Sequence, residues 1–231
     1  MGKVHPLRGF TLVEVLVALA LMAVMATLAW RGIDGMARAQ QTAQRTTDDV
    51  LALQAGLMQW RADLDAMMSW PGPGGALPAT PAGQRSLAWD GSVLRITRTS
   101  AGSVDAGLRV VAWMRRGGDG QWLRWQSAPV RSHAAWLAAW DEAARWSQTG
   151  APQGVQPGGA QAVAIASALE WQVRYFRNNA WTNALSSGAE SAANVNVLPD
   201  GVRLLITLAP GQGLAGALTV DWVRPDFGGA Q

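Results

Sequence analysis

Apolar side chains follow one another almost without interruption from Phe10 to Trp30. The only ionisable side chain in this run is Glu14, and no proline interrupts it. At a rise of about 1.5 Å per residue, a helix of roughly 20 residues is about 30 Å long, which matches the hydrocarbon core of a bilayer. The pattern therefore predicts a membrane-spanning helix over residues 10–30.

The helical pattern continues beyond the apolar run. No proline occurs between Pro6 and Pro71, and apolar residues recur at alternating spacings of three and four, namely Val50, Leu53, Leu57, Trp60, Leu64 and Met67. Residues with this spacing share one face of a helix. We therefore expect the helix to extend over residues 31–70, with Leu57, Trp60 and Leu64 buried against the rest of the chain.

Residues 71–231 have the pattern of antiparallel strands joined by turns. Asp90-Gly91 lies between two alternating apolar segments, and the turn "GGDG" lies between "LRVVAWMRR" and "QWLRWQSA", so both predict β-hairpins. Further strands are expected in "ALEWQVRYF", followed by a turn at "RNNAW", and in "GVRLLITLAP" and "GALTVDWV", whereas "AAWLAAWDEAARWSQ" predicts a short helix. The predicted fold class is α+β, with a long N-terminal helix followed by a β-rich head.

Glu14 is an unusual residue for a membrane helix. A carboxylate there costs about 2.5–3.5 kcal/mol on insertion scales, so its presence indicates a partner. A free amino group at Phe10 would be such a partner, and it exists only if the chain is cut after Gly9. We therefore predict a leader over residues 1–9, and a role for Glu14 in subunit assembly, because the two groups pair better between neighbouring helices than within one.

The stretch "RGFTLVEVLVALALMAV" resembles the N-terminus of type IV pilins and type II secretion pseudopilins. The resemblance implies that a prepilin peptidase cuts between Gly9 and Phe10, that Phe10 is N-methylated and that Glu14 docks subunits. The alternative is a plain signal anchor that happens to contain a glutamate. Lys3, His5 and Arg8 form a basic flank that should stay cytoplasmic, which sends the head outward.

Four further segments narrow the resemblance. "WRGIDGM", "LMQWRADLDAM", "ALEWQVRYFRNNAWTN" and "LPDGVRLLITL" resemble the J-type minor pseudopilin of type II secretion systems. This resemblance implies a pilin-like fold, a single-pass protein of the Gram-negative inner membrane with a periplasmic head, and partners among the I-, K-, H- and G-type subunits. The implied function is to prime a pseudopilus that exports folded proteins. A minor pilin that primes a type IV pilus is the alternative.

Composition and motifs argue against other classes of function. The chain of 231 residues has a formal charge of +3 and no cluster of basic residues, so no nucleic-acid partner is expected. It has no cysteine, and His133 is the only histidine outside the expected leader. No hydrolase, zinc or nucleotide-binding signature occurs, and Asp63 and Asp65 alternate on the predicted helix instead of forming a calcium loop. We expect no catalytic residue, cofactor, metal or small-molecule substrate. The alternative is a membrane-anchored periplasmic enzyme or sensor without a recognisable signature.

Thirteen tryptophans are spread along the chain. Most are expected to pack in the core, but an exposed aromatic surface for a partner is the alternative. Trp136 and Trp140 lie one turn apart in the predicted short helix. They are the candidate contacts with partner heads, and a core position is equally compatible with their spacing.

Overall fold

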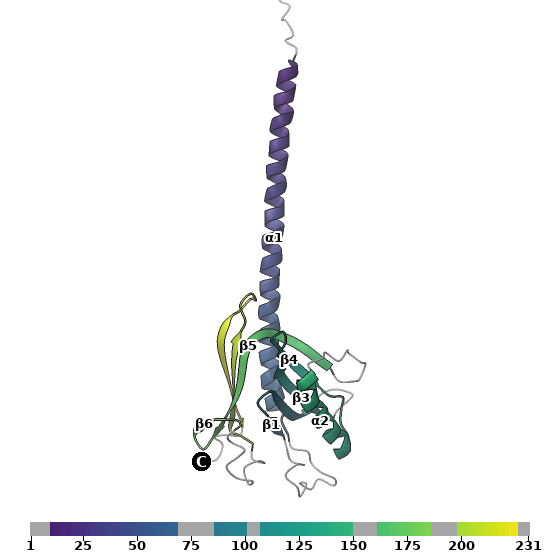
Figure 1. The fold of residues 1–231 in the computed structure, drawn as a ribbon, viewed down its shortest axis with the longest axis vertical. Coiled ribbons are helices and arrows are strands. Elements are labelled where there is room, and N and C mark those ends of the chain that lie inside the picture. The colour runs from purple at the N-terminus through teal and green to yellow at the C-terminus, as the bar shows by residue number, and fades with distance from the viewer. Residues whose placement is uncertain (1–9, 69–85, 101–106, 150–160, 186–197, 226–231) are drawn as a thin grey trace, which may run out of the picture. The chain divides into compact units, whose positions relative to one another are not determined.

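The structure is a computed structural model that describes residues 10–68, 86–100, 107–149, 161–185 and 198–225 (Figure 1). The expected leader, including Gly9, lies outside the described residues. The chain divides into two compact units, Met1–Thr47 and Asp48–Gln231. The first part of the long helix, up to Thr47, belongs to the first unit. The second unit contains the last part of this helix, from Asp48, and all the described strands.

The long helix α1 runs from Leu12 to Asp65, which confirms the predicted continuous helix. The expected end near residue 70 is wrong, because the chain leaves the helix at Asp65 to join the edge of strand β2 (Val93–Ser100). There Met68 N donates to Thr97 O at 2.9 Å, and Thr99 N donates to Ala66 O at 3.0 Å. This pairing satisfies backbone groups beyond the helix end, so the helix need not continue to the prolines.

The head is an antiparallel sheet with one additional helix, which confirms the predicted α+β class. The strands are β1 (Leu87–Trp89), β2, β3 (Gly107–Arg115), β4 (Gln121–Gln126), β5 (Gln161–Arg177), β6 (Ala180–Asn183), β7 (Gly201–Leu208) and β8 (Gly216–Val223). Their hydrogen-bonded order is β1-β2-β3-β4-β5-β7-β8, and β6 pairs with β5. Helix α2 (His133–Thr149) lies between β4 and β5 in the sequence, where the short helix was predicted.

The predicted turns are confirmed, and their residues explain why they form. Gly91 has a φ of +95°, and the Asp90 carboxylate accepts hydrogen bonds from the backbone of Ser92 and Val93. Asn178 and Asn179 close the β5–β6 hairpin with φ values of 50° and 62°. Two consecutive residues with positive φ match the twist of an antiparallel hairpin, and asparagine tolerates this conformation well.

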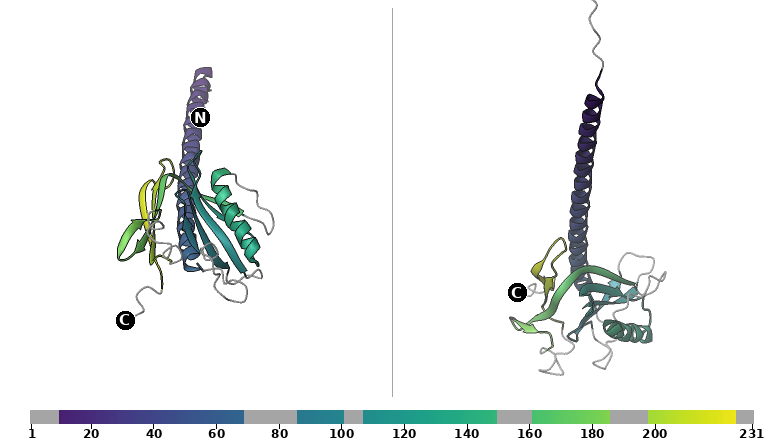
Figure 2. Two further views of the ribbon diagram at one scale, coloured as in Figure 1. Left: turned by 60° about the horizontal axis from the view of Figure 1, so that its bottom comes forward. Right: turned by 45° about the horizontal axis from the view of Figure 1, so that its top comes forward.

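Within the second unit, the sheet bends around the last part of α1 (Figure 2). The first part of β5 pairs with β4 and its last part pairs with β7, so β5 belongs to both halves of the sheet. Leu53, Trp60 and Leu64 of α1 are buried between the halves, and Leu57 is partly buried, as predicted. At Gly56 an added Cβ would lie 2.2 Å from Cγ2 of Ile165, so this glycine allows β5 to cross α1 closely.

Helix α2 covers the opposite face of the β1–β4 part of the sheet and forms a second core (Figure 2). Trp136 is 0% exposed and Trp140 is 4% exposed, so the expectation that they form a contact surface for partners is wrong. Trp136 Nε1 donates to Thr97 Oγ1 at 2.9 Å, and the guanidinium of Arg95 lies 5.1 Å from the Trp140 ring centroid. Both tryptophans lie on the face of α2 that packs on the sheet, so their spacing reflects core packing.

Candidate assembly surfaces

The start of α1 is a capping box made by Thr11 and Glu14. Glu14 N donates to Thr11 Oγ1 at 3.3 Å, while Glu14 Oε2 accepts bonds from Thr11 N at 3.0 Å and from Thr11 Oγ1 at 2.9 Å. The two residues thus satisfy backbone donors that a helix start would leave unpaired. Sequence reasoning missed this role, although the pattern Thr-x-x-Glu is its ordinary signature. The box fixes the Glu14 carboxylate about one helical turn from Phe10.

The first part of α1 exposes its apolar side chains. More than half of the surface of Leu16, Leu19 and Met25 is exposed, and Phe10 is almost fully exposed. Among the described residues, α1 is the one helix long and apolar enough to cross a membrane by length and composition. Apolar side chains on this scale need lipid or another helix to cover them.

The last part of α1 has an exposed apolar stripe opposite its buried face. Leu51 is 56% exposed and Met58 is 68% exposed. Ala55, between them in the sequence, and Ala62, after Met58, are also exposed. The spacings of four, three and four put these residues on one face. We call Leu51, Ala55, Met58 and Ala62 the outer stripe. Its small and apolar side chains suit close packing with a second helix.

Asp63 is fully buried and joins α1 to three strands. Its carboxylate accepts bonds from Arg124 at 2.8 and 2.9 Å and from Trp113 Nε1 at 2.9 Å, and it pairs with Arg98. Gln59 Nε2 donates to it at 2.8 Å. Sequence reasoning missed this residue because its strand partners lie 35 to 61 positions further along the chain. Each of these hydrogen-bond partners is an N–H donor, so the carboxylate holds α1 against strands β2, β3 and β4.

No metal centre accompanies Asp63 in the described part of the chain. No group of three or more His, Cys, Asp or Glu side chains lies close enough there to hold an ion. Asp65, two positions further, instead accepts a bond from Trp222 Nε1 at 2.7 Å. The two aspartates therefore bind different strands of the head.

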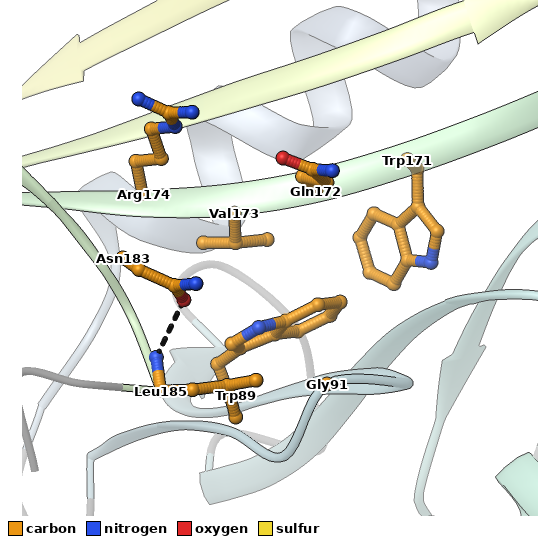
Figure 3. Close-up of a pocket in the computed structure, with 8 residues that line it drawn as sticks. All are labelled: Trp89, Gly91, Trp171, Gln172, Val173, Arg174, Asn183 and Leu185. Carbon is orange, nitrogen blue, oxygen red and sulfur yellow. Dashed lines mark hydrogen bonds between the residues drawn. The ribbon is translucent and has the colours of Figure 1, made fainter.

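A cavity of about 320 Å³ opens between the middle of β5 and the β1–β2 hairpin (Figure 3). The side chains of Trp89, Trp171 and Val173 point toward one another across it, and Asn183 and Leu185 close one end. The two indole rings are perpendicular, with their centroids 4.7 Å apart. No pattern in the sequence predicts this cavity, because β1, β5 and β6 come together only through the bend of the sheet.

Comparisons with known proteins match the N-terminal part of the chain to a family. Residues 8–30 match the family described as the prokaryotic N-terminal methylation motif. No curated protein matches the chain. Among solved structures, the chain is similar to a chain of the GspK-GspI-GspJ complex from the type 2 secretion system of enterotoxigenic Escherichia coli. The two chains are 16% identical with a TM-score of 0.45, and the match covers 76% of this chain and 97% of the other.

Proposed function

We propose that this chain is a J-type minor pseudopilin, a tip subunit that primes the pseudopilus of a type II secretion system. The observation that carries the proposal is the N-terminal methylation motif over residues 8–30, whose glutamate is fixed at the start of a 54-residue helix. In this proposal, a prepilin peptidase cuts between Gly9 and Phe10 and Phe10 is N-methylated. The protein then stays in the inner membrane by one span, with its head in the periplasm.

Glu14 acts as the docking group in this proposal. Thr11 uses only Oε2 of the carboxylate, and among the described residues no bond to Oε1 is formed. A methylated amino group at Phe10 of a neighbouring helix would give the second oxygen a charged donor. An ion pair in a low-dielectric surrounding is strong and geometrically selective, so it would favour one register between neighbouring helices.

The proposed partners are other subunits of the same assembly. The outer stripe and the apolar first part of α1 offer helix surfaces to neighbouring pseudopilins, and the head offers contacts to I- and K-type tip subunits, with H- and G-type subunits further along. The membrane lipid and the prepilin peptidase complete the set of partners. The proposal assigns no catalytic residue to the chain.

The proposal is tested by a secretion assay in a strain that lacks this gene. The full chain should restore export of folded proteins, and Glu14→Gln should restore it poorly. Glutamine keeps the capping box because its amide oxygen also accepts from Thr11, so this substitution removes the charge alone. The Glu14→Gln variant should also insert into the membrane more easily, because no charged side chain then enters the bilayer.

Thr11→Ala is the matched control, because it weakens the helix cap by about 1 kcal/mol and keeps the carboxylate. It should secrete nearly as well as the unchanged protein. Full secretion by Glu14→Gln would remove the docking role. A deletion strain that still secretes but loses surface pili would show that the chain primes a type IV pilus instead.

A further inference from the structure

Among the described residues, the middle of β5 has a strand partner on one edge only. β4 pairs with β5 as far as Ser167, and β6 begins to pair with it at Arg174 on the same edge, while β7 occupies the other. Among the described strands, none pairs with residues 169–173 on that edge. An unpaired stretch of strand edge offers backbone N–H and C=O groups to an incoming extended segment.

A β-bulge opens the strand at the start of this gap. The register between β5 and β7 shifts between Ala168 and Glu170, so Leu169 is the additional residue and is 52% exposed. Bulges bend a strand and redirect its side chains. This start of the gap is fixed from the β4 side, because Ala168 N donates to Gly120 O at 2.7 Å and Arg115 Nε donates to Ala168 O at 2.6 Å.

The inner side of the gap is the cavity of Figure 3. Trp171 and Val173 of β5 face Trp89 across it, and Leu185 at its end is 52% exposed. A volume of about 320 Å³ can hold one large apolar side chain. A second cavity of about 370 Å³, lined by Leu169, Glu170 and Arg115 among others, adjoins it along the same strand.

The outer side of the gap carries the positive charge of Arg174. Arg174 points away from Trp89 in Figure 3, and it lies directly opposite Arg203 in the β5–β7 ladder. Asp221 binds Arg203 with two bonds of 2.6 Å, whereas Arg174 has no ion pair among the described residues. Two like charges opposite each other destabilise a sheet, so a carboxylate beside Arg174 would be favourable. Glu170 lies four residues away at the other end of the gap, where it would repel that carboxylate.

We infer that this gap is a docking site for an extended segment of a neighbouring subunit, which inserts one large apolar side chain next to an acidic residue. Successive side chains of a strand point to opposite faces. The apolar residue therefore enters the cavity beside the contacting Trp89 and Trp171 rings, and the adjacent acidic residue reaches Arg174. The backbone of the segment pairs with the open edge of β5. This inference rests on the proposed function, because it takes the partner to be a subunit of the same assembly.

The test places a photo-crosslinking residue, p-benzoylphenylalanine, at Leu185 of the full chain in secreting cells. We expect an adduct with another assembly subunit. Mass spectrometry should map it to an extended segment that contains a large apolar residue next to Asp or Glu. Arg174→Glu should reduce the adduct by about tenfold or more, because it puts like charges together. Changing the mapped acidic residue to Lys should then restore it.

Two matched controls keep the test specific. The same crosslinker at Leu214, which is 50% exposed in the turn between β7 and β8, should not give this adduct. Arg131→Glu, an exposed charge reversal before α2, should leave the Leu185 adduct unchanged. No adduct, an adduct within one chain or between two copies, or an adduct that ignores Arg174→Glu would overturn the inference.

The same samples separate this inference from the proposed function. A chain that begins at methylated Phe10 but gives no adduct would remove only the docking site. A chain that retains its leader would remove the proposed function, whatever the adduct.

Discussion

The two parts of α1 place similar side chains in different surroundings. In the first part, Leu16 and Leu19 are more than half exposed, whereas in the last part Leu53 and Leu64 are buried in the head. The last part is covered by strands of its own chain, and a buried carboxylate fixes it there. The first part has no such cover among the described residues, so its stability depends on lipid or on other helices. One helix thus supplies both a core element of the head and an exposed apolar surface.

Asp63→Ala is expected to lower the free energy of unfolding more than any other substitution discussed below. It leaves Arg98 and Arg124, which are only 18% and 13% exposed, without their carboxylate, and breaking a buried ion pair costs about 3–5 kcal/mol. Denaturant unfolding of the full chain in detergent would measure the loss. Asp65→Ala is the control, since it removes one bond to Trp222 and should cost about 1 kcal/mol. Equal losses for both would show that Asp63 does not fix α1 in the head.

Trp60→Ala tests the buried face of α1 directly. The side chain is fully buried and packs against both Trp113 and Trp122, with ring centroids 5.3 and 6.1 Å away, so its removal should cost about 3–5 kcal/mol. Met58→Ala, on the outer stripe two residues earlier, should change the unfolding free energy by less than about 0.5 kcal/mol. If Met58→Ala destabilised the isolated protein as much as Trp60→Ala, the outer stripe would be part of the core.

Alanine at two glycines should have opposite effects in the two parts of α1. At Gly56 the new methyl group would collide with Ile165, and overpacking costs about 1–3 kcal/mol. At Gly35 nothing lies within 4 Å, so alanine should stabilise the helix by about 0.5–1 kcal/mol. The midpoint of thermal unfolding should therefore fall for Gly56→Ala and rise for Gly35→Ala. A stabilising Gly56→Ala would contradict the close crossing of α1 and β5.

The smallest effect is expected from an exposed ion pair in the β3–β4 turn. The hydrogen bond from Arg116 lowers the pKa of Asp119 from 3.8 to about 2 in the folded protein. A lowered folded pKa means that the pair stabilises above pH 3.8 and stops doing so as the pH falls through 2. Asp119→Asn should thus melt slightly below the unchanged protein at pH 7, and the difference should shrink as the pH falls from 3.8 through 2. A difference that stays constant over that range would have another cause.

Local signals in the sequence predicted the elements of the fold well. Asp90-Gly91 and the Asn178-Asn179 pair marked turns because their own backbone conformations define the turn. The end of α1 was predicted too late in the chain. The residues after Asp65 leave the helix to pair with β2, where Met68 N donates to Thr97 O, and Thr97 lies far away in the sequence. Helix termination here is a tertiary effect, which no pattern near residue 65 could reveal.

The candidate surfaces were less predictable than the fold. Trp136 and Trp140 have the spacing of one helix face, and that spacing alone does not say whether the face meets a sheet or a partner. The role of Asp63 and the gap beside Trp171 depend on which strands come together. The N-terminal methylation motif over residues 8–30 could be recognised from the sequence because its residues lie close together in the chain.

The central claim is that the first part of α1 is an assembly helix made by cutting the chain after Gly9. Mass spectrometry of the N-terminus, on protein purified from cells with an active prepilin peptidase, tests it most directly. The account predicts a chain that begins at Phe10 and carries one added methyl group, and a Gly9→Leu variant that stays uncut because of the added bulk. A chain that retains Met1 in those cells would contradict the account.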